Sequence, residues 1–593
     1  MKNDSTVILN KVKDLVKRKV YLRCRWIPRL HFVLLGMILL LFFFVGLHSV
    51  FADEKKNNKF GIHLAQPHLE DLVKAKLLLN SSGGDWGYVT LVIQENDRDR
   101  GKWQEIFDKM REFHLIPIIR IATQPEGSLW KRPRKEDGDS WVSFLDSLNW
   151  VVKERYIVLF NEPNHGSEWG GSVDPKDYAS VSLEFAKKLK QKNSNFFIML
   201  AGLDASAPHS PPNYEDEAAF LKQVFSNLPA GRQGETIEQW NNVLSGLASH
   251  SYPNPGFSGA PYGFGRGTVR TYQWELGLLK QLGLKDLPVF ITETGWVRGD
   301  EAVVADNYKI AFENVWLPDD RVFAVTPFVF DYQGDPFLDF SWKLPSVQAT
   351  EKQEFFQQFY TVQGLEKQKG RPEQIEKGEI SFDFPKELVA HSSFHFSIKL
   401  KNIGQALWDK EFGYKVVIMD KAGKPFEYFF SDLRKIQPPR NEELDFFIKT
   451  NGTLGKRTII VELQKDNESV MRSREWNFEI FPLPKLIFGV SLFPHLKSNG
   501  DNFEVQIFNT KEEIVFKEKG VRVKNGKGTI GEVRNIALGK TYRVVILKPG
   551  YLPRQTFVTF HKGKNQAKFE ILWPFDFNGD GKFDLTDLLF QKP

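Results

Sequence analysis

The chain has 593 residues, a length that at about 100 to 200 residues per domain predicts several domains and excludes a single small binding module. Its composition is that of a folded protein, with 41% hydrophobic, 14% aromatic and 26% charged residues. The formal net charge is +6, but residues 1–30 hold nine Lys/Arg against two Asp. The rest of the chain is therefore close to neutral, which excludes nucleic acid as a partner.

The N-terminal region, residues 1–52, combines this basic arm with an export signal. An uncharged apolar stretch follows the arm and ends at Ala52, and it is long enough to cross a bilayer. Two interpretations remain open: a signal peptide cleaved before Asp53, or an uncleaved anchor that holds residues 30–52 in the membrane. Both predict an extracellular or cell-surface protein. The one cysteine, Cys24, lies in the arm, so residues 53–593 contain no disulfide and no thiol nucleophile.

Residues 53–365 alternate apolar strand-like runs with amphipathic helical patterns, which is typical of a parallel sheet built from βα units. One helix is predicted to begin with Asp174 as its N-cap and Pro175 at its first position. Eight runs can be counted in this region, and they predict a (β/α)8 TIM barrel with its active site at the carboxyl ends of the strands. The runs are 61–65, 88–93, 116–121, 156–160, 196–201, 247–252, 288–292 and 322–330.

Two of these runs end in a glutamate. The fourth run leads into Asn161, Glu162 and Pro163, and the seventh leads into Glu293 within the sequence Thr-Glu-Thr-Gly-Trp. Strands four and seven lie on opposite sides of an eight-stranded barrel, so the two carboxylates are expected to converge across its mouth. Paired carboxylates in this arrangement hydrolyse glycosidic bonds.

The two motifs resemble those of clan A of the glycoside hydrolases, the retaining barrel enzymes that include cellulases, mannanases and β-xylosidases. The resemblance covers about half of the chain. It implies that Glu162 is the acid/base, Glu293 the nucleophile and Asn161 the donor to the sugar 2-hydroxyl. It also implies that a His or Tyr at the end of the sixth run, where His250 and Tyr252 lie, orients the nucleophile, and Tyr252 is the candidate for that contact.

Three further residues are weaker candidates for substrate contacts. His63 lies in the first run and Arg120 near the end of the third, where either a polar lining or a packing role fits. The eighth run ends in Phe330, where many clan A relatives have a tryptophan that stacks on the sugar. Trp296 is therefore predicted to replace that ring, with Trp342 and Trp169 as alternatives.

Beyond the barrel, the sequence predicts a closing helix over 351–364 and a charged linker over 366–377. Alternating strand patterns then predict an immunoglobulin-like β-sandwich over 378–482. After a Pro-Leu-Pro step, a second small β-sandwich is expected over 485–573. Sugar binding and spacing are both open as roles for the two sandwiches, and the sequence favours spacing.

The last segment, 574–593, contains an EF-hand-like loop. Oxygen-bearing side chains occupy the first, third, fifth, ninth and twelfth positions, and a glycine occupies the sixth, as a Ca²⁺ loop requires. The segment resembles one half of a dockerin repeat, the module that attaches bacterial glycosidases to scaffold proteins, although a dockerin has two such loops. Ca²⁺ is thus expected here, and a scaffold or cell-surface protein is a candidate partner. The predicted ligands are Asp576, Asn578, Asp580, Lys582, Asp584 and Asp587.

Together these features predict an exported retaining glycoside hydrolase that cleaves β-glycosidic bonds of a poly- or oligosaccharide without a catalytic cofactor. The alternative is a barrel that has lost turnover and acts as a carbohydrate-binding or surface adhesion protein. The sequence defines neither the sugar nor the linkage.

Overall fold

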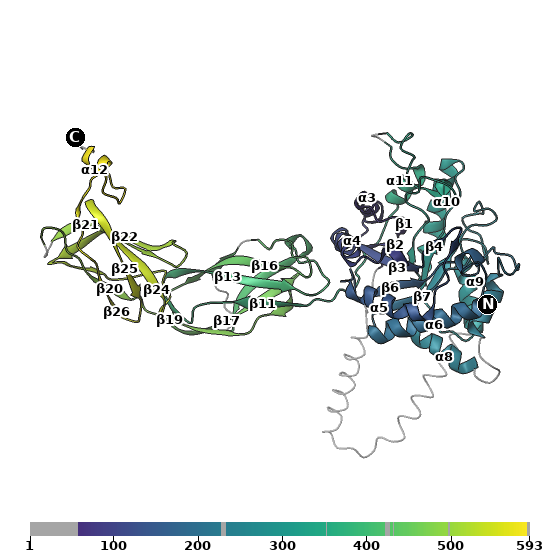
Figure 1. The fold of residues 1–593 in the computed structure, drawn as a ribbon, viewed down its shortest axis with the longest axis horizontal. Coiled ribbons are helices and arrows are strands. Elements are labelled where there is room, and N and C mark those ends of the chain that lie inside the picture. The colour runs from purple at the N-terminus through teal and green to yellow at the C-terminus, as the bar shows by residue number, and fades with distance from the viewer. Residues whose placement is uncertain are drawn as a thin grey trace, which may run out of the picture.

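The computed structural model describes residues 57–226, 233–350, 353–421, 427–430, 432–495 and 499–589. The predicted basic arm and export signal, residues 1–52, lie outside these ranges. Within them, no helix combines the length and the apolar character that are needed to cross a membrane. Figure 1 shows a rounded body with helices on its outside, followed by two strand-rich bodies that extend from it in a line.

Eight parallel strands form the centre of the rounded body. They are β1 (Gly61–Leu64), β2 (Gly87–Gln94), β3 (Leu115–Ala122), β6 (Arg155–Leu159), β7 (Phe196–Leu200), β8 (Leu247–His250), β9 (Val289–Glu293) and β10 (Val322–Val325). Strands β1-β2-β3-β6-β7 make one hydrogen-bonded sheet and β8-β9-β10 another. Two parallel bridges, Ile198 to Leu244 and Phe60 to Val325, join the sheets at both edges. The eight strands therefore close into a ring in sequence order, as a (β/α)8 barrel requires.

Helices follow most of these strands and cover the outside of the ring (Figure 1). They are α3 (Leu69–Leu79), α4 (Arg100–Phe113), α5 (Gly138–Ser147), α6 (Pro175–Lys192), α7 (Glu217–Phe225), α8 (Gln233–Val243), α9 (Thr271–Gln281), α10 (Glu301–Ala311) and α11 (Gln357–Gly364). Helix α6 begins as predicted, because the Asp174 side chain accepts a hydrogen bond from the amide of Asp177 and Pro175 takes the first helical position. The closing helix is shorter than predicted, since α11 begins only at Gln357.

Aromatic side chains fill the ring, where Tyr88, Tyr156, Phe197 and Phe290 of four strands pack on one another. Alternate residues of the strands, such as Ile62, Val89 and Ile157, have almost no exposed surface and belong to one hydrophobic cluster with the inner faces of the helices. The eighth strand ends at Val325, five residues before the end of the predicted run. The residues after it leave the ladder and run across the mouth of the barrel, where they contribute to the cavity described below.

The first strand-rich body contains two sheets, as predicted. One has the order β11 (Gly378–Phe382), β13 (Ser392–Asn402), β16 (Asn441–Thr450), β15 (Glu427–Phe430). The other has the order β12 (Glu387–Val389), β19 (Trp476–Phe481), β17 (Gly455–Lys465), β14 (Tyr414–Asp420), and β18 (Glu468–Arg472) pairs with β17. The inner residues of both sheets pack into one core.

The eight strands of the second strand-rich body form one continuous hydrogen-bonded order. The order is β26 (Lys564–Lys568), β20 (Lys485–Gly489), β23 (Lys527–Ile530), β22 (Ile514–Lys524), β21 (Gly500–Phe508), β24 (Thr541–Lys548), β25 (Gly550–Thr559), β27 (Pro574–Asp576). The first strand thus pairs with a strand about 80 residues later in the chain, in parallel. The core of this body is continuous with that of the first sandwich.

The segment predicted as a linker, 366–377, lies against the barrel. The backbone amide of Lys153 donates to the carbonyl of Glu373, and the Gln374 side chain donates to the carbonyl of Val151 at 2.8 Å. The first sandwich also contacts this end of the barrel, since Gln405 donates to the carbonyl of Val152. These contacts lie at the end of the strands opposite to the candidate site.

Candidate active site

A cavity of about 870 Å³ opens at the carboxyl ends of the barrel strands. His63 comes from β1, Arg120 from β3 and Glu293 from β9, while Asn161 and Glu162 follow β6. The cavity therefore lies where the barrel topology predicts a site, and six of its lining residues are candidates named from the sequence: His63, Arg120, Asn161, Glu162, Tyr252 and Glu293.

Glu162 is held by a tight turn that follows β6. Phe160 and Glu162 both have positive φ values, 73° and 31°, so the backbone bends sharply after the apolar strand. The amide of Glu162 donates to the carbonyl of Gly202, which ties this turn to the loop after β7. As a result, the side chain of Glu162 projects into the cavity and remains one-fifth exposed.

Glu293, the last residue of β9, is the more buried of the two glutamates and retains 8% of its surface. Tyr252 donates its hydroxyl hydrogen to Oε2 of Glu293 at 3.1 Å. The guanidinium of Arg120 donates to Oε1 of Glu293 and also to Oδ1 of Asn161, the latter at 2.6 Å. Arg120 thus links the residue next to one carboxylate with the other carboxylate.

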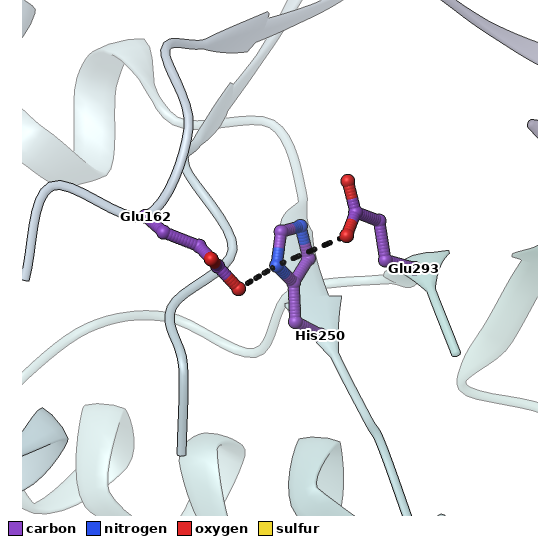
Figure 2. A group of neighbouring side chains, drawn as sticks. All are labelled: Glu162, His250 and Glu293. Carbon is purple, nitrogen blue, oxygen red and sulfur yellow. Dashed lines mark hydrogen bonds and ion pairs between the residues drawn. The ribbon is translucent and has the colours of Figure 1, made fainter. Parts of the chain in front are cut away.

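His250 lies between the two glutamates (Figure 2). Its Nδ1 is 2.7 Å from Oε1 of Glu162 and 3.8 Å from Oε2 of Glu293. One polar atom from each of the three residues lies within 4.8 Å of the other two. The carboxylates of Glu162 and Glu293 therefore approach each other closely across the mouth of the barrel.

The electrostatics of this group favour an ionised Glu293. Burial by itself would raise the pKa of Glu293, but the positive charges of His250 and Arg120 outweigh burial and lower that pKa below its usual range. Burial likewise opposes protonation of His250, yet the negative charges of Glu293 and Glu162 raise the pKa of His250. The group therefore favours a carboxylate at Glu293 and the protonated form of His250.

His63 contributes differently from His250. Burial, and then the positive charge of Arg120, lower the pKa of His63 to about 3, so its ring is neutral at physiological pH. Its Nδ1 lies 3.7 Å from Oε1 of Glu293 and has no hydrogen-bond partner among the described residues. Its ring packs edge-on against Phe328 at a centroid distance of 5.1 Å. His63 therefore lines the cavity without forming an ion pair.

The position of His250 depends on a glycine in a neighbouring loop. A Cβ atom on Gly202 would lie 2.2 Å from Cδ2 of the His250 ring. Only a residue without a side chain lets the imidazole lie where it reaches both glutamates.

Several polar residues of the cavity were missed by the sequence analysis, and three of them lie near Glu162: Glu168, His165 and Asp204. His165 Nε2 lies 2.9 Å from Oδ2 of Asp204, and burial and then the negative charge of Glu162 raise the pKa of Glu168 to about 7. Glu168 and His165 lie within six residues of Glu162 in one polar loop. Closeness in sequence to the motif was the only signal that could have identified them.

The prediction for Trp296 is wrong. Its ring is buried and packs against Tyr308 at 4.9 Å, and its indole N–H donates to the carbonyl of Gly259, outside the cavity. The alternatives Trp342 and Trp169 are fully buried as well. One tryptophan does line the cavity, Trp130 of β5 (Leu129–Trp130), in the segment between β3 and β6. The other aromatic rings of the lining come from the loops after β8 and β10, where they pack on one another: Tyr252, Phe257, Phe328, Tyr332, Phe337 and Phe340.

The predicted Ca²⁺ loop lies between β27 and α12 (Leu585–Leu589). Its two terminal carboxylates are buried, with Asp587 accepting from the amides of Phe577 and Asn578 and Asp576 accepting from that of Gly579. Among the described residues, Glu162, His250 and Glu293 are the only three His, Cys, Asp or Glu residues placed closely enough to hold a metal ion. Other side chains of the loop also accept hydrogen bonds from its own backbone. Asn578 accepts a hydrogen bond from the amide of Asp580, and Asp580 accepts one from the amide of Lys582. Asp584 accepts one from the amide of Thr586.

No family model matches the chain, and no curated protein matches it in sequence. Several solved structures are similar to it at low identity. An endo-β-1,4-glucanase from Xanthomonas axonopodis pv. citri is 10% identical, with 52% of this chain and 97% of that chain covered and a TM-score of 0.35. An endo-β-1,4-mannanase from Thermotoga petrophila is 10% identical over 72% of this chain and 99% of that chain, with a TM-score of 0.31.

A third similar structure is an endo-β-1,3-glucanase from Sorangium cellulosum. It is 13% identical, with 52% of this chain and 97% of that chain covered and a TM-score of 0.31. At scores this low, none of the three assigns an activity to this chain.

Proposed function

We propose that this protein is a retaining glycoside hydrolase that cleaves β-glycosidic bonds with Glu162 and Glu293. The observation that carries the proposal is the approach of the two carboxylates across the barrel mouth, with one oxygen of each within 4.8 Å of the other. Retaining enzymes place their carboxyl groups about 5 to 5.5 Å apart, whereas inverting enzymes leave about 6.5 to 9.5 Å for a water molecule.

In the first step, the ionised Glu293 attacks the anomeric carbon and forms a glycosyl ester. The proton held between Glu162 and His250 passes from Glu162 to the glycosidic oxygen, and the leaving sugar departs as an alcohol. Ion pairing with Arg120 keeps Glu293 ionised, and the Tyr252 hydroxyl holds the direction of its carboxylate.

In the second step, Glu162 acts as the base. It takes a proton from a water molecule, the resulting hydroxide attacks the anomeric carbon, and the ester bond to Glu293 breaks. Two inversions at the same carbon restore the original configuration, and the proton returns to the pair formed by Glu162 and His250. Asn161, held by Arg120, is the proposed donor to the sugar 2-hydroxyl.

The hydrogen bonds that hold Glu162 and Glu293 in place favour an enzyme over a protein that only binds carbohydrate. Arg120, Tyr252 and His250 all direct a polar hydrogen at one of the two glutamates, although each bears the desolvation that burial imposes. A site used only for binding gains nothing from a buried, ionised nucleophile of this kind.

Further parts of the proposal concern the ends of the chain. We place the catalytic body outside the cell, secreted or anchored through residues 30–52.

We also propose that the loop from Asp576 to Asp587 binds Ca²⁺ through side-chain oxygens and the carbonyl of Lys582, with a structural effect only. If so, EDTA lowers the thermal midpoint of the wild type, and D576A removes that sensitivity. An identical midpoint with and without EDTA would refute Ca²⁺ binding.

The activity is tested with the full-length protein on a panel of aryl β-glycosides and β-linked polysaccharides. The wild type is expected to hydrolyse at least one of them, and E293Q none. E162Q should lose about 10²- to 10⁴-fold in kcat/KM on sugar leaving groups, but far less in kcat/KM on a 2,4-dinitrophenyl glycoside, whose leaving group needs no proton. On that glycoside its kcat should still fall, because the second step has lost its base. The exposed Glu105 supplies the control variant E105Q. Binding without cleavage of any substrate would favour the adhesion alternative.

A further inference from the structure

A third carboxyl group faces the same cavity. Glu168 ends a short 3₁₀ turn, Gly166–Glu168, six residues after Glu162, and lines the cavity with it. Its charged neighbours are Glu162, Arg120 and His165, and Asn161 forms a hydrogen bond with it. The guanidinium of Arg120 already donates to Glu293 and Asn161. No step of the proposed reaction uses Glu168.

The turn that presents Glu168 is fixed on both sides. The amide of Gly166 donates to the carbonyl of Asn213 at 2.7 Å, and a Cβ on Gly166 would lie 2.8 Å from the carbonyl oxygen of Pro212. The next residue, Trp169, is fully buried and donates its indole N–H to Asp177. Because its neighbours are anchored in this way, Glu168 is held in the cavity wall and is not part of a freely moving surface loop.

Glu168 lies on the side of the acid/base. The amide of His165, which immediately precedes the turn that carries Glu168, donates to the carbonyl of Glu162 at 2.8 Å. Burial, and then the negative charge of Glu162, raise the pKa of Glu168. An acid/base must reach the glycosidic oxygen, so the leaving sugar has to lie against Glu162 and away from the nucleophile. His165 and Asp204, which pair with each other, also line this part of the cavity.

We propose that Glu168 determines specificity by binding hydroxyl groups of the leaving sugar, and that this sugar is uncharged. This inference rests on the proposed function. A carboxyl group offers two oxygens to neighbouring hydroxyls, and its protonated form can also donate a hydrogen bond. A sugar with a carboxylate or sulfate would lie near the carboxyl groups of Glu162, Glu168 and Asp204, and the histidines His250 and His165 are already paired with the first and the last of these.

The test compares two substrates that share a glycone accepted by the wild type. One is an aryl β-glycoside, whose leaving group has no hydroxyls, and the other is the matching β-linked oligosaccharide. The full-length variant E168A should lose about 10- to 100-fold in kcat/KM on the oligosaccharide and less than about threefold on the aryl glycoside. E168Q, which keeps hydrogen-bonding atoms, should lose less on the oligosaccharide than E168A.

Equal losses on both substrates would overturn the proposal, because they would mean that Glu168 acts by positioning Asn161. No loss on either substrate would overturn it as well. A thermal unfolding midpoint of E168A equal to that of the wild type shows that the variant folds. A wild type that cleaves neither substrate would overturn the proposed function itself, and this inference with it.

A second arm tests the charge of the sugar. The wild type should cleave an oligosaccharide with a uronic acid as leaving sugar more slowly than its neutral counterpart, and E168Q should narrow that difference by at least about fivefold. A difference of the same size in both proteins would overturn the assignment of an uncharged leaving sugar to Glu168.

Discussion

Nδ1 of His250 lies 2.7 Å from Glu162 and 3.8 Å from Glu293, so one buried imidazole faces both catalytic candidates (Figure 2). Burial has the largest effect on the pKa of Glu293 and raises it, and the positive charge of His250 has the next largest effect and lowers it. The same ring shares a proton with Glu162. Protonation of the acid/base and ionisation of the nucleophile are therefore coupled through a single side chain.

Replacing His250 by asparagine removes this charge. The pKa of Glu293 should then rise, and the acidic limb of the kcat/KM profile, below which Glu293 becomes protonated, should shift to higher pH. We also expect kcat to fall by about 10²-fold, since the proton shared with Glu162 is lost. The pH profile of H250N measures both effects, with the exposed His561 replaced in a control. An unshifted acidic limb would contradict the proposed coupling.

The hydroxyl of Tyr252 donates to Glu293 at 3.1 Å, and its loss should weaken the orientation of the nucleophile. We expect Y252F to lower kcat by about 10- to 100-fold, because a hydrogen bond to a charged group contributes about 1.5 to 3 kcal/mol. Tyr262 is 61% exposed in the same loop, and Y262F is the matched control. If Y252F and Y262F had the same kcat, the contact would have no role in catalysis.

Gly202 tests the packing behind His250. A methyl group there would lie 2.2 Å from the imidazole, so G202A must displace the ring or the loop after β7. We predict that G202A loses at least about 10²-fold in activity and about 1 to 3 kcal/mol in the free energy of unfolding. At the exposed Gly299 an added methyl group would meet only open space, so G299A should leave both quantities unchanged. Full activity of G202A would show that His250 can move without cost.

Glu217 on α7 and Glu275 on α9 form a second, buried carboxyl pair, which the proposed reaction does not use. Both side chains are almost completely buried. Burial, and then the negative charge of Glu275, raise the pKa of Glu217. Burial also raises the pKa of Glu275, which forms a hydrogen bond with Ser249.

Because these pKa values are raised in the folded protein, the unfolded chain binds fewer protons above the ordinary carboxyl range. The free energy of unfolding should therefore fall as the pH rises from about 5 towards 9. E217Q should flatten this decline and should be more stable than the wild type at pH 8, with E105Q as the control. Urea unfolding at several pH values measures it. A decline as steep in E217Q as in the wild type would show that the pair does not cause it.

The positions of the two glutamates could be predicted from sequence because a strand end is a local feature. An apolar run, then Asn161 and Glu162, then Pro163 leaves little choice of where β6 stops, and counting eight such runs places Glu293 opposite. The fate of Trp296 could not be predicted in this way. Its ring is buried through contacts with Tyr308 and Gly259, residues that the chain brings to it from other elements.

Two other features also depend on contacts between distant parts of the chain, and the sequence did not specify them. Glu168 lies in a polar loop whose composition resembles any solvated turn, and its environment depends on Arg120, about 50 residues earlier in the chain. In the second strand-rich body, β26 lies at one edge of the sheet and pairs with β20, a pairing between distant segments that strand patterns alone do not specify.

The central claim is that Glu293 forms a covalent bond to the sugar. It is tested most directly by treating the full-length protein with a 2-deoxy-2-fluoro β-glycoside of an accepted glycone, carrying a 2,4-dinitrophenyl leaving group, and sequencing the labelled peptide by mass spectrometry. We predict one sugar, attached to Glu293. With an unmodified β-glycoside of the same glycone, NMR should show a first product of β configuration. A label on another residue, or a first product of α configuration, would contradict the proposed mechanism.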